Sequence, residues 1–320
     1  MNILLNILLL VVGFVALIKG ADFFVDGAAS LARKLKIPSL IVGLTIVAMG
    51  TSAPEMAVSV SSSIKGSNAL AISNVIGSNI FNMMVVLGVC AAIAPIAVNK
   101  DVIKRDFPVN IAAVVLFMVF LLVSNGITRL FGFILFAGLI AYIIFSIRAA
   151  KSNPTEDEPP ADFSPLKCAL FIIGGAAGIV IGGDLVVDNA QAIALAAGMS
   201  ETLVGLTICA VGTSLPELVT SITATKKGEN DMAVGNVVGS NLFNVLGIIG
   251  ISGLISPIEL GANAHDSLVD SVILTVFTVI CFVFSLTGLK ITRIQGILLV
   301  FLYVAYMAFA ILRNYGFVAI

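Results

Sequence analysis

The chain has 320 residues, of which 59% are hydrophobic and 11% charged, and its formal net charge is −1. Soluble domains carry roughly 25% charged residues, so this composition excludes a soluble globular protein, and the near-neutral charge excludes a nucleic-acid-binding surface. Because a membrane-spanning helix needs ~20 apolar residues, the length accommodates about ten spans once loops are allowed.

The apolar stretches predict an all-α polytopic membrane protein, because an open strand in lipid would leave backbone groups unpaired. Turn residues such as Pro38, Lys65-Gly66 and Asn125-Gly126 separate several of the stretches. We expect ten transmembrane helices, at residues 3–31, 39–64, 69–96, 107–124, 127–148, 166–195, 201–225, 231–256, 267–286 and 292–313.

One polar segment, residues 151–165, interrupts the apolar stretches. Its sequence, KSNPTEDEPPADFSP, contains four Pro and four acidic residues, a composition that does not support a buried helix. We interpret it as a cytoplasmic linker between a first repeat, 1–150, and a second repeat, 166–320, each with five spans. A regulatory cation or partner site in this linker is the alternative interpretation.

The positions of Lys and Arg predict the orientation, because cytoplasmic loops are enriched in both residues. The loops after odd-numbered spans contain thirteen of them: Arg33, Lys34, Lys36, Lys100, Lys104, Arg105, Arg148, Lys151, Lys167, Lys226, Lys227, Lys290 and Arg293. The opposite side contains three: Lys65, Arg129 and Arg313. We therefore expect a cell-membrane protein with both termini extracellular. Since each half has an odd number of spans, the two repeats are expected to be inverted, as in many transporters.

Two motifs occur twice at a constant offset of 162 residues. GLTIVAMGTSAPE at 43–55 matches GLTICAVGTSLPE at 205–217, and NVIGSNIFN at 74–82 matches NVVGSNLFN at 236–244. Each copy places a glutamate, Glu55 or Glu217, inside an apolar span. Two carboxylates at equivalent points of two halves predict one shared site.

The Gly-Thr-Ser-x-Pro-Glu element predicts a broken helix, because proline removes a backbone donor and clashes with the preceding turn. Freed carbonyls at membrane depth need partners, and cations supply them. A buried glutamate costs about 2.5–3.5 kcal/mol on insertion scales; a protonated, hydrogen-bonded glutamate is the structural alternative. The oxygen donors expected near the two breaks belong to Ala48, Thr51, Ser52, Glu55, Ala210, Thr213, Ser214 and Glu217.

The second motif places a serine and an asparagine four residues apart, on one helix face: Ser78 with Asn82, and Ser240 with Asn244. Helix packing through small residues is the alternative interpretation of this pattern. Combined with the first motif, the donors are carboxylate, hydroxyl, amide and carbonyl oxygens. This set excludes a zinc or copper preference and favours Na⁺ or Ca²⁺ over Mg²⁺, which demands strict octahedral geometry.

A further acidic repeat lies on the first and sixth spans, at Asp22 and Asp26 and again at Asp184 and Asp188. Spacing of four residues places each pair on one helix face. We expect these aspartates to lie along an ion entrance or near a membrane surface rather than to coordinate ions.

With these motifs, the chain resembles the prokaryotic branch of the sodium/calcium exchanger family of cation/Ca²⁺ antiporters. GTSAPE with NVIGSNIFN, and GTSLPE with NVVGSNLFN, are similar to the two alpha-repeats of that family. The resemblance covers nearly the whole chain. It implies a core of the second, third, seventh and eighth spans, and a tilted pair, the first and sixth spans, that slides across this core.

The resemblance also implies ligands, carried over by position. Ca²⁺ would be held by Glu55, Glu217 and the carbonyls of Thr51 and Thr213. Sodium sites would add Ser52, Ser78, Ser214, Ser240 and the carbonyls of Ala48 and Ala210, with Asn82 and Asn244 lining the centre. The implied activity is exchange of three Na⁺ for one Ca²⁺ by a single chain, with no cofactor and no enzymatic reaction.

One position departs from the family pattern, because many members have aspartate at the position of Asn244. The asparagine argues against a potassium-coupled exchanger, whereas proton coupling stays open because a glutamate exchanges protons as well as metals. Two other classes are weaker interpretations. A calcium channel usually gathers acidic rings from several subunits, and an intramembrane hydrolase has no nucleophile–histidine pair here.

Overall fold

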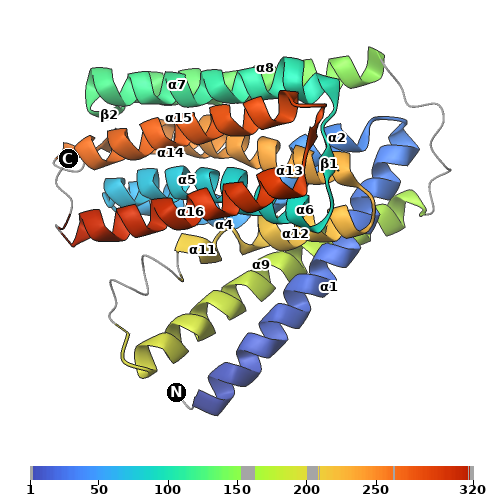
Figure 1. Cartoon of the computed structure of the whole chain (residues 1–320), viewed down its shortest axis with the longest axis horizontal. Helices are drawn as coiled ribbons and strands as arrows, with labels where there is room; N and C mark the ends of the chain where they lie inside the picture. Colours follow the sequence, from blue (N-terminus) through green and yellow to red (C-terminus); the bar gives the residue numbers. More distant parts are fainter. Residues whose placement is uncertain are drawn as a thin grey trace.

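The computed structural model describes residues 3–152, 163–199, 208, 210–261, 264–315 and 317. Most of the expected linker, 153–162, and the start of the expected seventh span therefore lie outside the described residues. The described residues are largely helical (Figure 1).

The first half consists of α-helices of very different lengths and three short π-helical turns, the latter named η. They are α1 (Ile3–Leu35), α2 (Ser39–Val42), η1 (Gly43–Val47), α3 (Ala48–Thr51), α4 (Ala53–Ile64), α5 (Asn68–Phe81), η2 (Asn82–Val86), α6 (Leu87–Ile93), η3 (Val102–Asp106), α7 (Phe107–Ser124) and α8 (Arg129–Ser152). In the second half they are α9 (Pro165–Ala196), α11 (Ala210–Gly212), α12 (Leu215–Lys226), α13 (Asn230–Leu242), η5 (Phe243–Ile248), α14 (Ile249–Ile255), α15 (Ala264–Leu286) and α16 (Arg293–Asn314).

These helices confirm a polytopic all-helical membrane fold. Among the described residues, eight helical runs are long and apolar enough to cross a membrane, and the pair Ser39–Thr51 and Ala53–Ile64, bent by 51°, forms a ninth. The expected span 201–225 is described only in its later part, as α11 and α12. The run Asn230–Ile255 is 83% buried and Arg293–Arg313 is 11% buried, so the former lies in the core and the latter faces lipid.

The fourth span begins earlier than expected. The sequence places its start at 107, next to Pro108, but the structure continues the helix back through η3 to Val102. Proline is tolerated within the first turn of α7, and the wider π-helical turn before it relieves the clash with the preceding carbonyls.

Two short strand pairs relate the halves to each other. β1 (Ile96–Ala97) pairs with β4 (Lys290–Ile291), and β2 (Gly126–Ile127) pairs with β3 (Ile258–Glu259), both antiparallel. β1 and β3 are separated by the 162-residue offset, yet they lie at opposite ends of the molecule (Figure 1). Equivalent segments at opposite ends are what an inverted repeat produces.

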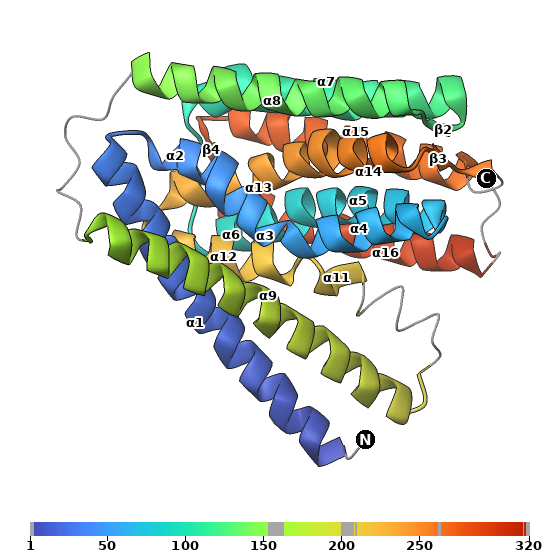
Figure 2. The ribbon, with the colours of Figure 1, turned by 180° about the vertical axis from the view of Figure 1, so that it is seen from behind.

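The long helices α1 and α9 form an antiparallel pair that slants across the other helices in both views (Figures 1 and 2). Glycines allow their backbones to touch: a Cβ added at Gly20 would lie 2.7 Å from the Ile179 nitrogen, and one at Gly175 would lie 2.6 Å from the Phe24 nitrogen. Close backbone approach through glycine is a strong packing device in membranes. The backbones of the two helices are therefore in close contact.

The α1–α9 pair is docked unequally on the remaining helices. α1 packs closely against α12, and a buried apolar cluster joins α1 to α13 through Ala28, Ala32 and Met232. The matching helix of the other half, α9, makes no comparable contact with α4. We call the end of the molecule at which α8 stops and α9 starts the linker end; α1 is closed against the core at this end (Figure 2).

Candidate cation site

Both Gly-Thr-Ser-x-Pro-Glu elements break their helices as the sequence predicts. Ser52 (φ −83°, ψ 11°) separates α3 from α4, and Ser214 (φ −96°, ψ 7°) precedes α12. Pro54 and Pro216 occupy the first turn of the following helix, where the missing N–H is tolerated. Each glutamate thus lies in the first turn of a helix, where the helix dipole favours a negative charge.

The carbonyls near the breaks differ from the expectation. The Ala48 carbonyl is not released, because it accepts the Ser52 amide at 3.0 Å and, more weakly, the Thr51 hydroxyl at 3.4 Å. In the second half, the Ser214 amide bonds the Val211 carbonyl at 3.2 Å. A carbonyl oxygen has two lone pairs, so a cation at Ala48 would use the second one.

The two glutamates are fully buried and are held by serines of the opposite half. Glu55 and Glu217 each have 0% exposure. The Ser52 hydroxyl donates to Glu217 Oε1 at 2.8 Å, and the Ser214 hydroxyl donates to Glu55 Oε1 at 3.1 Å. Because each break supplies the serine for the other glutamate, the two breaks meet at one place. The structure therefore brings the two repeated motifs together, as a shared site would require.

A second hydroxyl reaches each carboxylate from its own half. Ser78 donates to Glu55 Oε1 and Ser240 donates to Glu217 Oε1, both at 3.5 Å. The other oxygen of each carboxylate, Oε2, is buried and has no hydrogen-bond partner among the described residues. Buried charged oxygens without partners are costly, and either a bound cation or a proton would remove that cost.

The two central asparagines add further unpartnered oxygens. Asn82 starts η2, which packs against α12, and Asn244 lies in η5, which packs against α4. Both side chains are buried, and the Oδ1 atom of each has no partner in the described part of the chain. Asn244 Nδ2 donates to Asn79 Oδ1 at 2.9 Å, which turns its own oxygen away from that bond. Each asparagine therefore has an unpartnered oxygen on a turn that packs against the helix carrying the glutamate of the other half.

The two threonines next to the breaks differ. Thr51 is buried and its hydroxyl donates to Asn236 Oδ1 at 3.1 Å. Thr213 is half-buried, and its hydroxyl oxygen has no partner among the described residues. A side-chain hydrogen bond therefore ties the threonine of the first break to α13. The threonine of the second break makes no such bond with any described residue.

Two bracing pairs were not assigned from the sequence. Asn74 donates to the Ser59 hydroxyl at 2.9 Å and to the Glu55 carbonyl at 3.3 Å. Asn236 donates to the Ser221 hydroxyl at 2.9 Å and to the Glu217 carbonyl at 3.5 Å. These bonds hold the helix turn that carries each glutamate. Their signal was present, because Asn74 and Ser59 both recur at the same 162-residue offset.

Asn79 and Asn241 support the backbone of each other's helix. Asn79 Nδ2 donates to the Asn241 carbonyl at 3.2 Å, and Asn241 Nδ2 donates to the Asn79 carbonyl at 3.1 Å. This reciprocal pair joins the two halves beside the carboxylates.

The four aspartates of the first and sixth spans make no hydrogen bond with the two glutamates. Asp22 and Asp26 pair with Lys227, whereas Asp184 and Asp188 are exposed and make no ion pair with any described residue. None of the four is bonded to Glu55 or Glu217, which agrees with the peripheral position expected for them.

The site consists of oxygen donors around two carboxylates. Within the described residues, no group of three or more His, Cys, Asp or Glu side chains is close enough to hold a metal. A transition-metal centre therefore has no support in this part of the chain. Carboxylate, hydroxyl and amide oxygens suit a hard cation such as Na⁺ or Ca²⁺.

Comparisons with known proteins agree with this chemistry. The sequence profile of the sodium/calcium exchanger protein family matches residues 5–148 and 167–312. The chain is 38% identical to the putative antiporter CaxA of Alkalimonas amylolytica, over 92% of this chain and 95% of that protein. It is 32% identical to the sodium/calcium exchanger MaX1 of Methanosarcina acetivorans, over 95% and 98%. A solved structure of the sodium-calcium exchanger NCX_Mj superposes with a TM-score of 0.85 at 31% identity, covering 96% of this chain and 99% of that one.

Proposed function

Because the chain belongs to the sodium/calcium exchanger family, we propose that it is a secondary antiporter that exchanges Na⁺ for Ca²⁺ across the membrane. The observation that carries this proposal is the pair of buried carboxylates. Glu55 and Glu217 come from different halves, and each accepts a hydrogen bond from a serine of the other half. One buried oxygen of each carboxylate has no partner among the described residues.

Ca²⁺ would bind between the two glutamates. Two ionised carboxylates offset its double charge, and Ca²⁺ takes about six to eight oxygen ligands. The carbonyls of Thr51 and Thr213, beside the two breaks, and the Oδ1 atoms of Asn82 and Asn244 are the neutral oxygens proposed to complete the shell. The described hydroxyl bonds to Oε1 leave Oε2 of each glutamate for the ion.

Na⁺ would compete for the same carboxylates. Its proposed sites combine Glu55 or Glu217 with hydroxyls and carbonyls of the breaks, namely Ser52, Ser78, Ser214, Ser240, Ala48 and Ala210. Because the charge of both ions is balanced by the same two glutamates, Na⁺ and Ca²⁺ exclude each other. We further propose the exchange of three Na⁺ for one Ca²⁺ that the family resemblance implies, which would move one net positive charge per cycle.

Alternating access would follow from the inverted halves. We propose that residues 1–150 and 166–320 are the two repeats, joined by a cytoplasmic linker at 151–165, and that both termini are extracellular. The asymmetry of Lys and Arg supports this orientation. On this basis the linker end faces the cytoplasm, and one chain contains a complete site.

The proposal is tested by ⁴⁵Ca²⁺ uptake into proteoliposomes under an imposed Na⁺, K⁺ or H⁺ gradient, with the membrane potential clamped. We expect uptake to be driven by an outward Na⁺ gradient and to respond to the potential as a net charge movement. Glu55→Gln and Glu217→Gln should each abolish it.

Glu259→Gln is the matched control, because Glu259 is an exposed residue of β3 outside the site. Uptake driven by H⁺ or K⁺ and indifferent to Na⁺ would replace the proposed coupling ion. Na⁺-driven uptake that survives either glutamate substitution would contradict the proposed site.

A further inference from the structure

An ion-pair cluster holds α1 to the core at the linker end. Lys227, directly after α12, places its Nζ atom 2.7 Å from Asp26 Oδ1 and 3.6 Å from Asp22 Oδ1. The same ammonium donates to the Asp22 carbonyl at 3.0 Å. Lys19 approaches Asp22 Oδ2 at 3.7 Å from within α1. One lysine of the core thus bridges two successive turns of α1.

The sequence contains the same set of residues once more. Lys65 precedes Lys227 by 162 residues, and Asp184 and Asp188 follow Asp22 and Asp26 by the same offset. In the structure these three side chains are exposed and make no ion pair with described residues.

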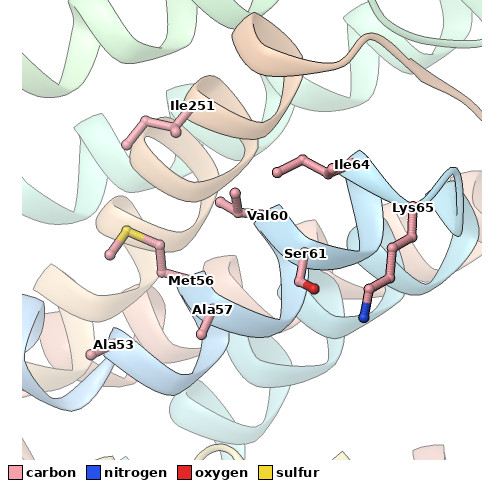
Figure 3. Close-up of a pocket in the computed structure, with 8 residues that line it drawn as sticks. All are labelled: Ala53, Met56, Ala57, Val60, Ser61, Ile64, Lys65 and Ile251. Carbon is pink, nitrogen blue, oxygen red and sulfur yellow. The ribbon is translucent and has the colours of Figure 1, made fainter.

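The core face beside Lys65 is open. Ala53, Ala57, Ser61 and Lys65 of α4 and the following turn line a groove of about 450 Å³, completed by Met56, Val60, Ile64 and Ile251 (Figure 3). On α12, the positions equivalent to Ala53 and Ala57 are Leu215 and Val219. These two side chains pack against the apolar cluster that contains α1. The same helix face is therefore covered by α1 in one half and open in the other.

We propose that Lys227 and Lys65 are alternating latches of the transport cycle. Lys227 bound to Asp22 and Asp26 holds the linker end closed, as in this structure. In the opposite state α9 occupies the groove on α4, and Lys65 binds Asp184 and Asp188. The inference rests on the proposed alternating access and adds to it the residues that stabilise each state.

The rigidity of the α1–α9 pair makes the two latches exclusive. The glycine contacts pack the two backbones closely together, so on this proposal the pair moves as one body. The two helices are antiparallel and their latches lie at opposite ends of the molecule, so a rocking motion that seats α9 on α4 lifts α1 from α12. Each lysine can then pair with its aspartates in one state only.

The latch at the linker end has an additional contact. Arg33 at the end of α1 pairs with Glu229, before α13, at 3.1 Å. The equivalent positions of the other half are Leu195 and Ser67, which cannot form an ion pair. The closed linker end is therefore the more strongly held state when no ion is bound.

Two matched reporters test this inference. Ala57→Cys and Val219→Cys occupy equivalent positions, one in the open groove and one under α1. They are introduced separately into the full chain with Cys90, Cys168, Cys209 and Cys281 replaced by alanine. Maleimide labelling rates are measured on purified protein without Na⁺ and Ca²⁺, so the readout does not depend on transport.

Before any latch is changed, Ala57→Cys should label faster than Val219→Cys. A partly exposed ion pair contributes about 0.2–1 kcal/mol, so Lys227→Gln should raise Val219→Cys labelling roughly threefold and slow Ala57→Cys labelling. Lys226→Gln, which removes a neighbouring charge, should change neither rate. Adding Lys65→Gln to Lys227→Gln should return both rates toward their starting values, and the exchange Asp26→Lys with Lys227→Asp should restore protection of Val219→Cys.

Equal labelling of Val219→Cys in Lys227→Gln and Lys226→Gln would overturn the latch at the linker end. Unchanged rates on adding Lys65→Gln would overturn the opposite latch. If the rates shift as expected but the parent protein performs no Na⁺-driven Ca²⁺ uptake, the latches stand and the proposed function fails.

Discussion

Two regions of the molecule differ in how closely their contacts follow the internal repeat. One surrounds the two glutamates, and the other docks α1 and α9 on the remaining helices. At the centre the two halves match: Ser52 bonds Glu217 as Ser214 bonds Glu55, at 2.8 and 3.1 Å. At the periphery they do not, because Lys227 is paired and its counterpart Lys65 is unpaired with any described residue.

This difference indicates that one set of residues binds the ions and another set determines which side of the molecule is open. A site of matched donors presents the same chemistry to either side of the membrane, so the side chains that bind ions do not decide which side is open. The unequal docking of a rigid helix pair does. Four comparisons test this division, beginning with the largest expected effect.

The rigidity of the α1–α9 pair is the first test. Gly20→Val places carbon atoms against the backbone of α9, where a Cβ would already lie 2.7 Å from the Ile179 nitrogen. Overpacking of this kind costs about 1–3 kcal/mol or more, so we expect a large loss of thermal stability and of exchange. Gly174→Val is the control, because an added Cβ there meets no described atom within 4 Å; equal losses in both variants would contradict the tight pairing.

The cross-half serines are the second test. Each donates to a buried carboxylate, and a hydrogen bond to a charged group contributes about 1.5–3 kcal/mol. Ser52→Ala and Ser214→Ala should therefore weaken Ca²⁺ binding by about tenfold or more, and by similar factors, in equilibrium ⁴⁵Ca²⁺ binding. A large effect of one substitution with none of the other would break the symmetry of the site.

The threonines next to the breaks are the third test, and here the halves should differ. Thr51→Val removes the bond to Asn236, worth about 1 kcal/mol, and should lower the unfolding temperature. Thr213→Val removes a hydroxyl without a described partner and should lower it less. Unfolding of both variants followed by intrinsic tyrosine fluorescence without ions compares them; equal shifts would show that the two breaks are packed alike.

The unmatched ion pair is the last and smallest test. Glu229→Gln weakens the contact with Arg33, and a pair of this kind contributes about 0.2–1 kcal/mol. We expect a modest rise in labelling of Val219→Cys, smaller than that caused by Lys227→Gln. Glu259→Gln serves as the control with the same charge change, and a rise of the same size there would rule out a local effect.

Much of the centre could be predicted from the sequence, because its chemistry is local and repeated. Proline after Gly-Thr-Ser breaks a helix wherever it stands, and the glutamate that follows is carried with it. The repeat then indicated that Glu55 and Glu217 share one site. The pairing of each serine with the glutamate of the other half could not be predicted, because it depends on how the two breaks face each other in space.

The unequal docking of α1 and α9 could not be predicted from the sequence. Asp22 and Asp184 look equivalent in the sequence, and so do Lys65 and Lys227. In the structure Lys227 is paired and Lys65 is not paired with any described residue, because the molecule is in one conformational state. A sequence repeat alone does not indicate which state that is. The early start of the fourth span was missed for another reason: Pro108 reads as a boundary, although the helical run continues before it through the π-helical turn η3.

The central claim, one cation site shared by the two halves, is tested most directly by counting bound Ca²⁺ on the purified chain in equilibrium ⁴⁵Ca²⁺ binding, with Na⁺ as competitor. The account predicts one Ca²⁺ per chain, displaced by Na⁺, retained by Glu259→Gln and lost in both Glu55→Gln and Glu217→Gln. Two Ca²⁺ per chain, with one lost in each glutamate variant, would show that each half has its own site and would contradict the account.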